Sequence, residues 1–190
     1  MTAPTHILTG LASVVVVGRL TEISPDAVSL LAFIVGTLAP DMDGNGSITR
    51  PGTILRGLLG REIGGVLDAI FELIAAVIRS LFGHRGFIHS PLVALCIIGS
   101  GHYWDMEWLM WFGGGYAAHL LGDAVTYAGI PLLSPFSSER FSFSKMKTGS
   151  RTECVLAGVL LVFVCIRGWT LLPEQVKQTH QQLYEVIANS

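Results

Sequence analysis

The sequence predicts an all-α protein, a membrane-embedded helical bundle of about four to five short spans with one additional amphipathic helix. Of the 190 residues, 51% are hydrophobic and only 14% are Asp, Glu, Lys or Arg, against about 25% in average soluble domains. The mean hydropathy is +0.57, and the apolar residues gather in separate runs. In a soluble chain of this size, 12 basic and 14 acidic residues would cover the surface poorly.

The first expected elements are two short apolar helices. Residues 7–17 and 27–39 are each shorter than the roughly 20 residues of a full span, and together they predict a helical hairpin. Ser24 and Pro25 favour the start of the second helix. Residues 41–65 are polar and rich in glycine, so we expect a long loop there.

The amphipathic helix is expected at residues 66–82, where Asp68 and Glu72 are four residues apart and share one face. Such a helix would lie on the membrane or cap the bundle. Ser90 is a good N-cap, so the next helix should begin at Pro91 and end near residue 100.

The last two spans are expected at residues 108–125 and 154–172, with a loop at residues 126–150 between them. Residues 1–172 would form one membrane-bound domain. The remaining residues, 173–190, would be a polar C-terminal tail.

The distribution of basic residues predicts an orientation in the cell membrane. With the spans above, residues 1–6, 40–90 and 126–153 lie on one side, which carries Arg50, Arg56, Arg61, Arg79, Arg85, Arg140, Lys145, Lys147 and Arg151. The other side carries Arg19, Arg167 and Lys177. The first side should therefore be cytoplasmic. The net charge of −2 and the lack of a long basic block argue against a nucleic-acid partner.

Histidine and aspartate residues scattered along the chain converge on that cytoplasmic side in this topology. Ionisable groups at an apolar bundle need partners, and a divalent metal ion suits several imidazoles and carboxylates at once. The candidate ligands are His6, Asp41, Asp43, His84, His89, His119 and Asp123.

Each candidate also has a plainer interpretation. His119 and Asp123 point the same way from one helix, but such a pair could simply join helices by hydrogen bonds. Asp41 and Asp43 could lie in a solvated turn, and a lone histidine could be a satisfied buried group. Arg85 suits an oxyanion, although it could equally face lipid headgroups.

The sequence contains no nucleophile elbow, phosphate-binding loop or H-E-x-x-H motif. Hydrolysis by serine or cysteine is therefore poorly supported. A metal-activated water is the better fit to the inventory of side chains.

Several blocks together resemble the YdjM family. They are Thr5-His6, Pro40-Asp41-Met42-Asp43, the segment HRGFIHS at residues 84–90, GYAAHLLGD at 115–123, Thr126, Gly129 and LLSPF at 132–136. Members are described as inner-membrane-associated, metal-dependent hydrolases, and one was named for binding the LexA repressor. The chain departs from the family pattern at Ile88 and Ala118, where Thr and Ser are usual, and neither change removes a candidate ligand.

The leading hypothesis is a membrane-bound, metal-dependent hydrolase that acts on a phosphoester or other ester, including lipid-linked ones. The seven candidates would hold one or two ions, zinc or else manganese. Asp43 would take the proton of the water and Arg85 would hold the oxyanion. The alternative is a non-enzymatic membrane protein with a structural metal or polar cluster, which recruits a cytoplasmic protein partner through the basic loop at residues 140–151.

Overall fold

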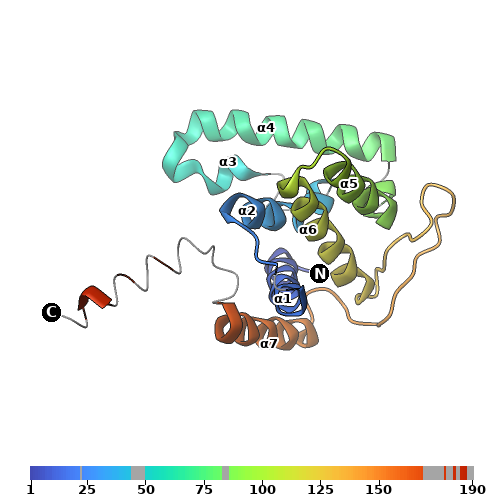
Figure 1. The fold of residues 1–190 in the computed structure, drawn as a ribbon. Coiled ribbons are helices and arrows are strands. Elements are labelled where there is room, and N and C mark those ends of the chain that lie inside the picture. Colours follow the sequence, from blue (N-terminus) through green and yellow to red (C-terminus); the bar gives the residue numbers. More distant parts are fainter. Residues whose placement is uncertain are drawn as a thin grey trace.

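The computed structural model describes residues 1–21, 23–43, 50–82, 86–168, 178, 182 and 185–187. Within these residues the chain is all-helical and contains no strand beyond isolated bridges, which confirms the predicted class (Figure 1). The helices are α1 (Ala3–Thr21), α2 (Ala27–Gly36), η1 (Ala39–Asp43), α3 (Pro51–Ile54), α4 (Arg56–Phe82), η3 (Phe87–His89), α5 (Pro91–Tyr103), α6 (Glu107–Ala124) and α7 (Arg151–Arg167).

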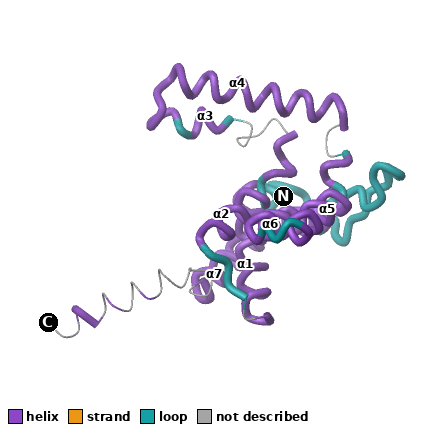
Figure 2. The backbone as a smooth tube through the Cα atoms, turned by 45° about the horizontal axis from the view of Figure 1, so that its top comes forward, coloured by secondary structure: helices purple, strands orange, loops and turns teal. Residues whose placement is uncertain are grey.

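Helix α6 is the centre of the arrangement. It packs against α1, α2 and α5, while α7 packs on the far side of α1 (Figure 1). Helices α3 and α4 form a separate layer above this bundle, as Figure 2 also shows. Because α6 contacts three helices, side chains from distant parts of the sequence can meet on its surface.

The prediction of a long loop at residues 41–65 is wrong. This segment contains η1 and α3, and α4 begins at Arg56 rather than near residue 66. Its glycines suggested a loop, but Gly52 and Gly64 instead let α3 and α4 approach until their backbones touch. Asp68 of α4 accepts hydrogen bonds from the amide and hydroxyl of Thr53, at 3.0 and 2.7 Å. The contacts between α3 and α4 thus stabilise helices in a segment whose glycine content predicts a loop.

Helix α4 is the amphipathic helix that the sequence predicts, and it is longer than expected. Its Asp68 and Glu72 share a face, and Glu72 pairs with Arg50 at 2.8 Å. The opposite face is apolar and exposed, and consists of Ile63, Val66, Ile70, Leu73, Ile74, Val77 and Leu81.

Among the described residues, one helix is both long and apolar enough to cross a membrane, namely α1. Helices α2 and α5 are apolar but shorter. A bundle of four to five spans is therefore not confirmed. The start of α2 is also corrected by two residues, since Asp26, rather than Ser24, caps it by accepting a hydrogen bond from the Ser29 amide.

The contact between α2 and α6 depends on two glycines. A methyl group at Gly36 would overlap the Phe112 carbonyl oxygen, and one at Gly115 would overlap the Phe33 carbonyl oxygen. The two helices therefore pack backbone against backbone, as small residues allow in membrane helices.

We expect Gly115→Ala to destabilise the fold by about 1–3 kcal/mol, because the new methyl group must push α2 away from α6. Gly158→Ala is the matched control, since a methyl group there would meet nothing within 4 Å. Thermal unfolding in detergent measures both. Equal stability of the two variants would show that this contact is looser than described.

The Asp68 carboxyl should make the α3–α4 contact sensitive to acid. Burial opposes its ionisation, but hydrogen bonds from Thr53 and Gly52 and the Arg56 charge outweigh this and hold its pKa below the ordinary value. Its contribution is complete above about pH 4 and is lost as the pH falls through the lowered pKa. The stability difference between the native chain and Asp68→Asn should shrink on acidification. A difference that persists undiminished at pH 2 would contradict this.

Candidate metal centre

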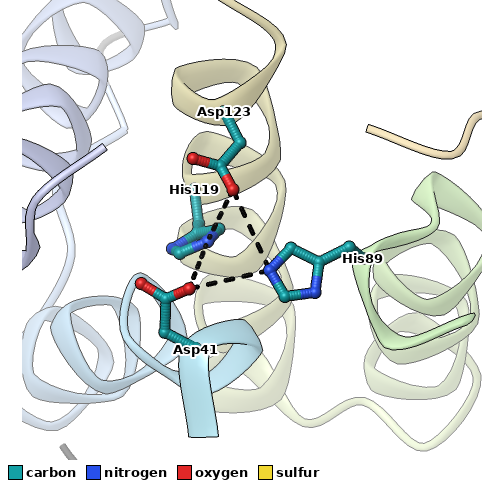
Figure 3. A group of neighbouring side chains, drawn as sticks. All are labelled: Asp41, His89, His119 and Asp123. Carbon is teal, nitrogen blue, oxygen red and sulfur yellow. Dashed lines mark ion pairs between the residues drawn. The ribbon is translucent and has the colours of Figure 1, made fainter. Parts of the chain in front are cut away.

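Four predicted site residues meet near the C-terminal end of α6. Asp41 comes from η1, His89 from η3, and His119 and Asp123 from α6 (Figure 3). One ligand atom from each lies within 4.8 Å of all the others. Residues up to 82 positions apart in the sequence thus form one group that could hold a metal ion.

This group is buried in a protein interior. His119 and Asp123 are fully buried, His89 is 1% exposed, and the Asp41 side chain is 23% exposed. The Nε2 atoms of His89 and His119 lie 3.6 and 3.7 Å from Asp41 Oδ1. They lie 3.9 and 3.7 Å from Asp123 Oδ2. Asp41 is therefore the member that faces the surroundings of the protein.

His6 joins the group from α1. Its ring stacks on that of His119, with centroids 3.7 Å apart and planes inclined by 10°. Its Nε2 lies 3.3 Å from Asp123 Oδ1, which also pairs with the ammonium of Met1 at 2.6 Å. His6, which the sequence places far from the other candidates, thus lies directly beside the group of four.

The tautomer of His119 follows from its neighbour. Its Nδ1 lies 2.8 Å from the carbonyl oxygen of Thr37, and a carbonyl can only accept a hydrogen bond. In a neutral ring, Nδ1 therefore carries the proton and Nε2 presents a lone pair to Asp41 and Asp123. A backbone carbonyl that orients an imidazole in this way is common among metal ligands.

The chemistry of the donors fits a divalent cation. Within the described residues, the ring nitrogens of His6 and His89 and the Nε2 of His119 are buried without a hydrogen-bond partner, which is costly in an interior. Burial raises the pKa of the Asp41 carboxyl, but the neighbouring imidazoles of His89, His119 and His6 outweigh this and hold it below the ordinary value. Anionic oxygens and imidazole lone pairs aimed at one point are the ligands that zinc and manganese take.

Several supporting residues were missed by the sequence analysis. The Tyr116 hydroxyl donates to the Ile88 carbonyl oxygen next to His89. Ser90 caps α5 as predicted, and its hydroxyl also donates to the Ser134 carbonyl oxygen at 3.0 Å, which the sequence did not indicate. Thr126 donates to the Asp123 carbonyl oxygen at 2.8 Å. All but Ser134 lie within or beside the motif blocks that carry the candidate ligands, which is the signal that could have found them.

Three candidates cannot be placed. His84 and Arg85 lie outside the described residues, as does the side chain of Asp43, although Asp43 ends η1. The other five candidates come together: His6, Asp41, His89, His119 and Asp123.

A family comparison agrees with the motif blocks. The family described as YdjM inner membrane protein matches residues 1–180. The chain belongs to the YdjM family. The Bacillus subtilis (strain 168) protein YvsG is 34% identical over 164 residues, which cover 85% of this chain and 91% of YvsG.

Other relatives match a shorter part of the chain. The inner membrane protein YdjM of Escherichia coli (strain K12) is 36% identical over 69 residues, which cover 33% of this chain and 35% of that protein. The Shigella flexneri protein of the same name gives the same match. No solved structure matches the chain. The family and these two relatives are named as inner membrane proteins.

We expect Tyr116→Phe to weaken metal binding by about tenfold, as changes behind a ligand commonly do. The variant loses only the hydroxyl that fixes the backbone beside His89. Tyr103→Phe is the control, since Tyr103 is exposed at the end of α5. Titration with Co²⁺ measures the affinity, and unchanged affinity in Tyr116→Phe would contradict the assigned role.

Proposed function

We propose that this protein is a membrane-bound, metal-dependent hydrolase. The observation that carries the proposal is the convergence of imidazole lone pairs and carboxylates in a buried group next to the partly exposed Asp41. Such an arrangement is unfavourable without a cation.

The ion would be held by His89, His119, Asp41 and Asp123, with His6 adjacent to them. Zinc fits this mixture of nitrogen and oxygen donors best, and the carboxylates make manganese the second choice. A divalent ion bound here would act as a Lewis acid and make water a nucleophile at neutral pH. Five neighbouring candidates exceed the four ligands of a closed structural site, which favours one catalytic ion or two ions.

The protein's own groups supply the rest of the proposed reaction. The partial exposure of Asp41 supports an approach of the substrate from the η1 side of the group. Asp43, at the end of η1, is the proposed base that accepts the proton of the attacking water. Arg85, four residues before His89, is the proposed anchor for the oxyanion of a phosphoester.

The proposed location is the inner membrane, with the site on the cytoplasmic side. Support comes from the names of the relatives and from the concentration of basic residues on one side of the expected topology. Helix α1 is the principal candidate span, and the shorter apolar helices α2 and α5 would complete the bundle with α6 and α7. A site beside the bilayer favours a lipid or lipid-linked ester.

The test measures metal content by mass spectrometry and hydrolysis of bis-p-nitrophenyl phosphate by the detergent-purified chain. We expect about one to two ions per chain, with metal and activity both lost in His119→Ala. His102→Ala is the matched control, because His102 is exposed in the last turn of α5.

Other outcomes would overturn the proposal in distinguishable ways. Tight metal binding with no hydrolysis of any phosphoester or carboxylester would favour a structural metal and the recruitment of a cytoplasmic partner. Unchanged metal content in His119→Ala would show that the ion binds elsewhere.

A further inference from the structure

Glu153, in the first turn of α7, is a buried carboxylate that no step of the proposed reaction uses. Its side chain is 2% exposed. One oxygen accepts hydrogen bonds from the amide and hydroxyl of Thr2, at 2.6 and 3.2 Å. The other oxygen accepts from the amide of Gly149 at 2.6 Å. The Thr5 hydroxyl lies within hydrogen-bonding reach of the same carboxylate and is 2.8 Å from the Thr2 hydroxyl.

These contacts lead directly to the metal centre. The carbonyl oxygen of Thr2 accepts a hydrogen bond from the amide of His6 at 3.0 Å. Thr2 is therefore bound to Glu153 through its amide and hydroxyl, and to His6 through its carbonyl. Glu153 and His6 are 147 positions apart in the sequence (153 − 6), yet only one residue separates them in this chain of hydrogen bonds.

His6 lies in the first turns of α1, and its two ring nitrogens have no hydrogen-bond partner among the described residues. The ring approaches Asp123 Oδ1 through Nε2 at 3.3 Å, and one such contact does not by itself fix where a ring lies. The stacking on His119 and the docking of the first turn of α1 contribute to its position.

We propose that Glu153 is a positioning residue for the metal centre: together with Thr2, Thr5 and Gly149 it forms an N-terminal latch that holds His6 against His119 and Asp123. The inference rests on the proposed metal-dependent function and adds α7 to the elements that build the site. Glu153 itself touches none of the candidate ligand atoms described above, so it acts through His6.

Glu153→Gln is a sharp probe because it conserves shape and reverses one hydrogen-bonding group. Both carboxylate oxygens accept from backbone amides, so the amide nitrogen of glutamine must face another donor whichever way it turns. Thr5→Val is the milder second variant, since it removes only a hydroxyl of this latch. Glu139→Gln is the matched control, because Glu139 is exposed in the loop before α7.

The experiment is a double-mutant cycle on Co²⁺ binding, read from the visible spectrum of the full chain in detergent. We expect Glu153→Gln to weaken Co²⁺ binding about tenfold and to shift the spectrum towards that of His6→Ala. Added to His6→Ala, Glu153→Gln should change the affinity by less than about twofold, because the interaction through which it acts is already gone. Thr5→Val should weaken Co²⁺ binding and shift the visible spectrum in the same direction as Glu153→Gln. Glu139→Gln should change neither the affinity nor the spectrum.

The remaining outcomes separate two failures. If the native chain binds Co²⁺ but Glu153→Gln and Thr5→Val leave affinity and spectrum unchanged, the latch is refuted and the metal centre stands. The same conclusion follows if Glu153→Gln weakens binding equally with and without His6. If the native chain and Glu139→Gln bind no Co²⁺, the metal centre is refuted, and the inference falls with it.

Discussion

The hydrogen bond from His119 Nδ1 to the Thr37 carbonyl is the constraint on which the site depends. Because Nδ1 carries the proton, Nε2 of a neutral His119 ring is unprotonated. Its lone pair faces the carboxylates of Asp41 and Asp123. Acceptors buried face to face repel one another unless a proton or a cation lies between them. A metal ion would remove the repulsion among all of these acceptors at once, whereas a single proton would remove it between only one pair of them.

The helices are arranged to satisfy this constraint. Thr37 follows α2 and His119 belongs to α6, so the bond requires the two backbones to approach closely, which Gly36 and Gly115 permit. Among the described residues, the largest fully buried side chains are His6, His89, His119 and Glu153, so the interior holds a polar group beside its apolar clusters. Natural proteins accept such a loss of stability where function requires it.

The sequence predicts the helices well where apolar runs are long, and poorly where glycines dominate. Gly52 and Gly64 suggested a loop, but they serve the packing of α3 on α4, which depends on partners far along the chain. His6 lies beside the site as expected, although its spacing in the sequence carried no signal and the spans used to place it are not confirmed. Thr37 was not predicted as part of the site because it contributes a backbone carbonyl, which every residue type carries. Glu153 was not predicted as part of the site because acidic residues are common in the first turn of a helix.

The central claim is that the His/Asp group binds a divalent cation, and anomalous diffraction at the zinc edge tests it most directly. Crystals of the zinc-loaded chain should show a peak about 2.0–2.2 Å from Nε2 of His89 and His119 and from an oxygen of Asp123. A map with no peak there, and with protonated histidines paired directly to Asp41 and Asp123, would contradict the account.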